Sequence, residues 1–154
     1  MTERPAGPHV VDASVAVSWL LRLPDETYGA EAERLVADHA ADHVRLVGPP
    51  HLSTEVGSAL LKAVRRGRIT PERGRTLVDA FHRLRVRELP AQPIALAARD
   101  LAQRYGCSYH DAGYLALDVL LGCPFVHADE KLRDKLAGGF PHEVWIADYR
   151  PASV

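Results

Sequence analysis

The sequence contains few cysteines, no long apolar run and almost no net charge. Its two cysteines, Cys107 and Cys123, flank one predicted helix. That helix would hold them farther apart than the roughly 7 Å that a disulfide allows between Cα atoms, and their spacing is not that of a zinc site. No run approaches the roughly 20 apolar residues of a membrane span, and the N-terminus lacks the apolar core of a signal peptide. We therefore expect reduced thiols and a cytoplasmic protein.

Two enzyme classes are disfavoured by missing motifs. After the first predicted strand the chain reads DASVAV instead of the G-x-G-x-x-G of a dinucleotide-binding site, which argues against a Rossmann dehydrogenase. Phospho-acceptor domains and aspartate-nucleophile phosphatases pair their acid with a lysine at the sheet edge. None of the three lysines here follows a predicted strand directly: Lys62, Lys131 and Lys135.

Charge is unevenly distributed, although the net charge is only −1. Basic residues, most of them arginine, crowd into the segment 62–87. Arginine suits bidentate phosphate recognition, so this segment could bind a polyanion. It could equally be the solvated face of a helix.

The 154 residues fit one domain with a hydrophobic core. Apolar runs predict strands, and helical periodicity predicts helices between them. One expected strand ends near residues 10–11, and four others span 44–47, 86–89, 125–127 and 144–146. The expected helices span 13–21, 26–42, 51–66, 71–84, 94–105, 108–121 and 130–136. This alternation predicts a three-layer α/β fold with a mainly parallel central sheet flanked by helices. We expect a loose leader at 1–8, the domain at 9–147 and a C-terminal tail at 148–154.

Four acids occupy positions that such a fold would bring to one edge of the sheet. Asp12 and Asp129 each stand between a predicted strand and the next helix, Asp111 begins a helix, and Glu55 lies within the first two turns of another. In open α/β sheets, ligands bind at the carboxyl ends of the strands. Local explanations remain open, because the three aspartates could be helix caps and Glu55 could reach water or an arginine beside its apolar stripe.

If these carboxylates converge, they would repel one another, and some would stay protonated without a cation. Mg²⁺ and Mn²⁺ prefer oxygen ligands, keep several waters and need only one or two direct carboxylates. Such an ion can lower the pKa of a bound water and neutralise charge on a phosphoryl group. The pattern therefore predicts a divalent-metal site suited to phosphodiester hydrolysis, with basic side chains steering the polyanion.

Four segments in order resemble the motifs of PIN-domain ribonucleases, and most closely those of the VapC toxins of bacterial type II toxin–antitoxin pairs. They are VVDASVAVSWL, HLSTEVGSALL, YHDAGYLALD and VHADEKL. The resemblance extends from about His9 to Ile146. It implies a Rossmann-like PIN domain, a homodimer, and an Mg²⁺- or Mn²⁺-dependent endoribonuclease that hydrolyses RNA with a metal-activated water. It also implies a cognate VapB-like antitoxin whose C-terminal part covers the active site.

The resemblance also implies roles for the four acids. Asp12 and Asp111 would be direct metal ligands, and Glu55 and Asp129 would act closer to water. With an acid such as Asp129 helping to remove its proton, the water would attack phosphorus in line and leave a 5′-phosphate and a 3′-hydroxyl. A catalytically silent PIN-fold module that binds RNA or protein remains the alternative, and metal-dependent cleavage of RNA would distinguish the two.

Three further residues are candidates for supporting these acids: Ser14, Ser58 and His127. Two of them depart from the family pattern. Ser58 stands where the family often has asparagine, and His127 stands where it usually has threonine or serine. His127 could donate a hydrogen bond to an acid or a water, ligate a metal itself, or simply be a partly buried histidine at a strand end.

Overall fold

The computed structural model describes residues 7–151. Within them, the chain forms a five-stranded sheet of order β3-β2-β1-β4-β5, and every neighbouring pair of strands is parallel. The strands are β1 (Gly7–Val11), β2 (Val44–Gly48), β3 (Arg87–Glu88), β4 (Phe125–His127) and β5 (Glu143–Trp145). The chain builds outward from β1 to β2 and β3, and then returns to the other side of β1 with β4. The strand order therefore reverses between β1 and β4, the position where open α/β sheets bind ligands.

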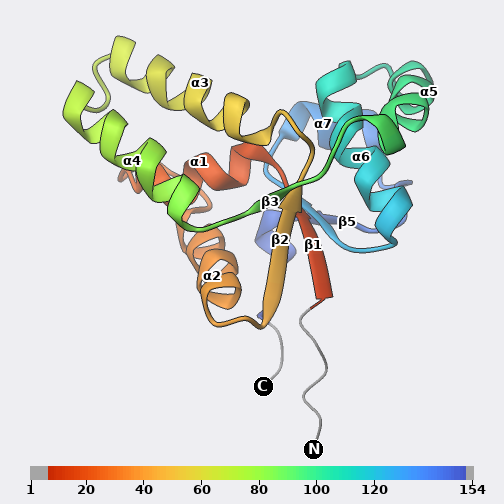
Figure 1. The fold of residues 1–154 in the computed structure, drawn as a ribbon, viewed down its shortest axis with the longest axis horizontal. Helices are drawn as coiled ribbons and strands as arrows, with labels where there is room; N and C mark the ends of the chain where they lie inside the picture. The colour runs from red at the N-terminus through yellow and green to blue at the C-terminus, as the bar shows by residue number, and fades with distance from the viewer. Residues whose placement is uncertain (1–6, 152–154) are drawn as a thin grey trace, which may run out of the picture.

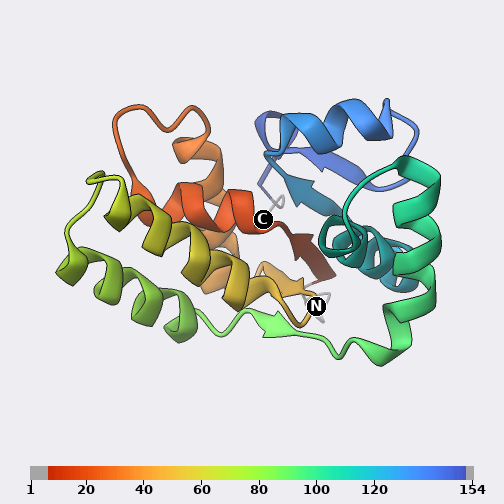
Figure 2. The same cartoon turned by 90° about the horizontal axis from the view of Figure 1, so that it is seen from above.

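Helices cover the sheet on both faces, and one pair extends away from it (Figures 1 and 2). The α-helices of the described residues are α1 (Ala13–Leu21), α2 (Gly29–Ala40), α3 (Leu52–Arg65), α4 (Pro71–Arg83), α5 (Ala95–Tyr105), α6 (Tyr109–Leu121) and α7 (Glu130–Leu136). Two short 3₁₀ helices, η1 (Gln92–Ile94) and η2 (Ile146–Asp148), complete the set. The hairpin of α3 and α4 forms an arm on the opposite side of the molecule from α5 and α6. The three-layer α/β prediction is confirmed.

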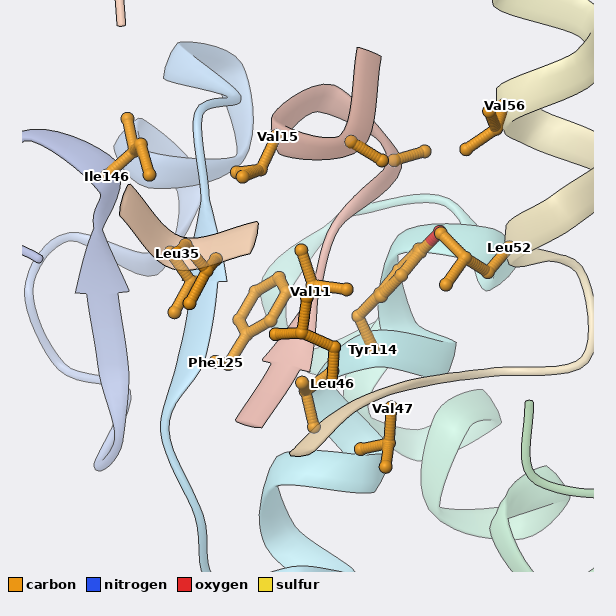
Figure 3. Packing of buried hydrophobic residues seen from close by; sticks show 14 of the residues in the cluster. Val11, Val15, Leu35, Leu46, Val47, Leu52, Val56, Tyr114, Phe125 and Ile146 are labelled. Carbon is orange, nitrogen blue, oxygen red and sulfur yellow. The ribbon is translucent and has the colours of Figure 1, made fainter. Parts of the chain in front are cut away.

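The core is centred on the two middle strands. Val10 and Val11 of β1 and Phe125 and Val126 of β4 have no exposed surface. Figure 3 shows Val11, Leu46 and Phe125 packed with side chains from the covering helices. Short β-branched and aromatic runs with no polar break are typical of strands buried on both faces, which is why the sequence predicted these strands well.

Local capping explains where several helices begin and end. The Thr70 hydroxyl accepts the Arg73 amide at 3.1 Å, and Pro71 occupies the first position of α4. Gly106 and Gly122 end α5 and α6 with φ of 63° and 58°, a left-handed conformation that glycine adopts readily. These short-range signals were legible in the sequence.

Several predicted elements have different bounds in the structure. The helix expected at 26–42 forms only at Gly29–Ala40, because Asp42 takes a left-handed φ of 58° that cannot continue a helix. The last strand spans Glu143–Trp145 instead of 144–146, because Ile146 already begins η2. The strand expected at 86–89 is shortened to β3, and Pro90, which follows it closely, has no amide to donate to a sheet.

The structure adds detail at both ends of the expected domain. Residues 1–6 of the expected leader lie outside the described residues, but Gly7 and Pro8 pair with β2 as part of β1. In the expected tail, Tyr149 is buried and its hydroxyl donates to Asp38, so this residue belongs to the domain. Both cysteines are free thiols. None of the helices in the described chain has the length and apolar character needed to cross a membrane.

Candidate metal centre

Asp12 lies at the carboxyl end of β1 and caps helix α1. Its carboxylate is almost fully buried and accepts hydrogen bonds from the backbone amide of Ser14, at 3.1 Å, and from the Ser14 hydroxyl. Burial raises the pKa of Asp12, and the charge of Asp111 raises it further, while the two bonds from Ser14 act in the opposite direction. Asp12 is therefore both a helix cap and a buried acid that is costly to ionise.

Ser14 connects the ends of the two central strands. Its hydroxyl donates to Asp12 and accepts the amide of Ala128 at 3.1 Å. Ala128 lies in the connection between β4 and α7, immediately before Asp129. The single hydroxyl thus fixes the loop that carries Asp129 relative to Asp12.

Asp129 caps α7 as one of the local explanations predicted. Its Oδ1 accepts the Leu132 amide at 3.0 Å, and its own amide donates to Nδ1 of His127 at 3.3 Å. Asp129 is not among the charges that shift the pKa of Asp12 or Glu55. It lies at the same sheet edge as Asp12 but stands apart from the acids that act on one another.

His127 is fully buried, and both of its ring nitrogens are engaged. Nδ1 accepts from the Asp129 amide, so Nε2 carries the proton and donates to Oε1 of Glu143 at 2.8 Å. The ring stacks on Phe125 with 5.1 Å between ring centroids and meets Trp145 edge-on. Of the three alternatives for His127, the metal ligand is excluded in this arrangement, because neither nitrogen is free to coordinate an ion.

Glu55 projects from the first turns of α3 without a hydrogen-bond donor. Its buried Oε1 lies 3.2 Å from Nε2 of His51, but that nitrogen donates its single proton to the carbonyl oxygen of His110 at 3.0 Å. Burial raises the pKa of Glu55 to about 7, and the charges of Asp12 and Asp111 contribute to the rise. Of the local alternatives for Glu55, no arginine pairs with it among the described residues, whereas 30% of its side chain is exposed to water.

Asp111 stands in the first turn of α6. The Ser108 hydroxyl accepts the Asp111 amide at 3.0 Å, which is half of the expected capping box. The Asp111 carboxylate makes no return hydrogen bond to Ser108 among the described residues. Its charge contributes to the raised pKa values of Asp12 and Glu55, so the three carboxylates are near enough to interact.

Asp12, Glu55 and Asp111 together form what we call the acidic cluster. No three His, Cys, Asp or Glu side chains within residues 7–151 are close enough, as they stand, to enclose a metal ion by themselves. Mg²⁺ needs only one or two direct carboxylates, however, with water for the rest. An unpaired buried carboxylate oxygen and two acids with raised pKa values mark an excess of negative charge that such an ion would neutralise. The oxygen donors of the cluster therefore fit Mg²⁺ or Mn²⁺.

Ser58, another candidate from the sequence, lies outside this cluster. Ser58 is exposed on α3, and its hydroxyl makes no hydrogen bond within the described residues. Asp118, in the same motif as Asp111, is fully buried and accepts from Nδ1 of His142 at 2.8 Å. Sequence reasoning missed His51 and Glu143. His51 lies one helical turn before Glu55, a spacing that could have indicated their contact, whereas Glu143 acts on His127, 16 residues away.

A cavity of about 740 Å³ lies between α3 and α4, away from these acids. It is mostly apolar, with Leu60, Leu61, Val64 and Val78 in its walls. None of the four predicted site acids lines it. This cavity of the arm is therefore not the metal centre.

Residues 9–136, which include all four acids, match the PIN domain family. The chain belongs to the PIN domain family. A VapC ribonuclease of Mycobacterium bovis, Mb0985, is 33% identical over 125 residues, which are 81% of this chain and 88% of that protein. The ribonuclease VapC12 of Mycobacterium tuberculosis is 32% identical over 123 residues, covering 80% and 88%. The resemblance to PIN-domain ribonucleases of the VapC kind is thereby confirmed.

A solved PIN-like neighbour supports the same architecture. The crystal structure of PAE2754 from Pyrobaculum aerophilum superposes with a TM-score of 0.66, covering 94% of this chain and 88% of that one. Its sequence identity is 18%. This structural similarity supports the fold of the chain.

Proposed function

We propose that this protein is an Mg²⁺- or Mn²⁺-dependent endoribonuclease, the toxin of a VapBC-type toxin–antitoxin pair. The observation that carries the proposal is the acidic cluster at the point where the strand order reverses. Its support is the set of relatives named VapC ribonucleases, which share about a third of their residues with this chain over most of its length. The RNA substrate and the VapB-like antitoxin are part of the same proposal, as is the homodimer that the family resemblance implies.

The four acids have distinct roles in this proposal. Asp12 and Asp111 would hold the ion directly, and Glu55 and Asp129 would hold it through water. When bound, the ion would lower the pKa of a water molecule and neutralise charge on the scissile phosphoryl group. Oδ1 of Asp129 is used in capping α7, so its other oxygen, Oδ2, would take the proton from the attacking water.

The arm provides the positive surface for an RNA backbone. Most basic residues of the segment 62–87 lie exposed on α3, α4 and the turns around them. Two are neutralised within the chain, since Arg68 pairs with Asp25 and Arg83 with Asp79, each at 2.6 Å. The remaining guanidinium groups would draw the polyanion toward the acids, an attraction that weakens with salt.

The test is cleavage of end-labelled single-stranded RNA with Mn²⁺, with Mg²⁺ and with EDTA. We expect cleavage only with metal, and a loss of about 100-fold or more in Asp12→Asn, since even the outer partners of metal ligands account for 10–100-fold. Asparagine keeps the acceptor that Ser14 uses, so the fold should survive. Asp100→Asn, at an exposed acid on α5, is the matched control.

The ends of the products decide the mechanism. Water attack leaves a 5′-phosphate and a 3′-hydroxyl. A 2′,3′-cyclic phosphate would mean attack by the ribose hydroxyl and would contradict the proposal. RNA binding without cleavage, in the wild-type protein and in the Asp12 variant alike, would favour a silent binding module.

A further inference from the structure

Tyr114 lies in the interior beneath the acidic cluster, held in a fixed orientation. It is one helical turn after Asp111 on α6 and therefore on the same face of the helix. It has no exposed surface, its ring stacks on Phe125 with 5.9 Å between ring centroids, and the His51 ring meets it edge-on at 5.5 Å. In Figure 3 the ring points from α6 toward Leu52 at the start of α3. Packing of this kind leaves the phenol little freedom to turn away.

The hydroxyl of Tyr114 has no hydrogen-bond partner among the described residues. Buried tyrosine hydroxyls are usually paired, because an unsatisfied polar group is costly in the interior. The Ala13 amide at the start of α1 is near enough to influence the phenol, but it does not satisfy hydrogen-bond geometry. Since that amide could only donate, the hydroxyl proton would in any case remain without an acceptor.

The groups near the Tyr114 hydroxyl include candidate acceptors for its proton. Burial raises the pKa of Tyr114, and the charges of Asp12, Glu55 and Asp111 raise it further, so all three acids of the cluster act on this phenol. The His51 ring that touches Tyr114 also lies 3.2 Å from Oε1 of Glu55. That oxygen is itself buried and unpaired. The residues that carry this unpaired donor and this unpaired acceptor thus both lie against the His51 ring.

We propose that Tyr114 is a positioning residue of the metal centre, whose hydroxyl donates to the Glu55 carboxylate, directly or through one water, once a divalent ion is bound. The inference rests on the proposed function, because the ion is what would draw Glu55 into place. Tyr114 does not touch the RNA in this assignment. It holds one oxygen of Glu55 so that the other faces the ion.

The test is Tyr114→Phe, which removes one oxygen and keeps the packed ring. Its control is Tyr149→Phe, since the Tyr149 hydroxyl donates to Asp38 and is satisfied in the fold. In EDTA we expect the melting temperature of Tyr114→Phe to equal or exceed that of the wild type, and that of Tyr149→Phe to fall. By calorimetric titration with Mn²⁺ we expect Tyr114→Phe to bind 10–100-fold more weakly, and Tyr149→Phe to bind like the wild type.

A double variant locates the partner of the hydroxyl. In a Glu55→Gln background, Tyr114→Phe should weaken Mn²⁺ binding much less than it does alone, because residues that act together are not additive. Additive losses would overturn the assignment to Glu55. Wild-type Mn²⁺ affinity in Tyr114→Phe, or a fall in its metal-free melting temperature like that of Tyr149→Phe, would overturn the inference while leaving the proposed function intact. Failure of the wild-type protein to bind Mn²⁺ would overturn both.

Discussion

The buried imidazole of His127 donates to the carboxylate of Glu143 across the pair of strands β4 and β5, with 2.8 Å between Nε2 and Oε1. The other nitrogen of the same ring holds the amide of Asp129. Through His127, Glu143 therefore helps to hold the backbone of Asp129, an acid of the candidate site. The pair thus holds the backbone of the loop that carries Asp129.

Removing the acceptor from this pair should destabilise the protein. Glu143→Ala leaves the Nε2 proton of His127 buried without a partner, which should lower the free energy of unfolding by about 1–3 kcal/mol. Glu143→Gln keeps an acceptor oxygen and should lose much less. Urea unfolding measures both, with Glu130→Ala, an exposed acid on α7, as control. Equal stability of Glu143→Ala and the wild type would show that the pair does not hold the loop.

Stability without metal should fall as pH rises. The folded protein holds a proton on Glu55 up to about pH 7, whereas the unfolded chain releases it near 4.5. The folded state therefore binds more protons than the unfolded state between these pH values. The contribution of Glu55 to the free energy of unfolding is lost as pH increases through this range. In EDTA, the melting temperature of the wild type should drop between pH 5 and pH 8, and Glu55→Gln should reduce the drop. Glu72→Gln, at an exposed site, should change nothing, and the same slope in all three proteins would contradict the prediction.

Mn²⁺ should stabilise the fold through Asp12. An ion that binds only the folded state at 100 times its Kd adds about 2.7 kcal/mol, or roughly 5–10 °C in melting temperature for a chain of this size. Asp12→Asn should lose most of this rise, and Asp100→Asn should keep it. A thermal shift assay with and without Mn²⁺ measures it. The same rise in Asp12→Asn and the wild type would place the ion elsewhere.

Gly113 should tolerate no side chain, because α6 lies directly against His51. A Cβ at this position would stand 2.7 Å from Cε1 of His51, whose ring is held by the His110 carbonyl. Gly113→Ala should gain about 1 kcal/mol of helix propensity but lose about 1–3 kcal/mol to overpacking. Gly57→Ala, in α3 with open space around it, should be stabilising. Chemical denaturation of both variants tests the contact, and a stabilised Gly113→Ala would refute it.

The sequence allowed the local part of this structure to be predicted. Thr70 and Ser108 cap the helices expected at 71–84 and 108–121, and the apolar runs at β1 and β4 are buried in a parallel sheet. An acid that caps a helix can also belong to the candidate metal site, so the two explanations for these residues do not exclude each other. Asp12 and Asp129 cap helices and also stand at the sheet edge, whereas Asp111, which could also have been a cap, contributes through its charge to the raised pKa of Glu55.

What the sequence determined by itself is the set of features that depend on neighbours a few residues apart: strand and helix identity, helix caps and the order of the four acidic motifs. Tertiary structure alone decided which charges meet. Glu55 is left without a donor, Asp118 is paired with His142, and His127 with Glu143. The reason is physical, because such partners are 16 or more residues apart in the chain and come together only when the strand order of the sheet is set. The local periodicity of the sequence does not determine the order of the strands in the sheet.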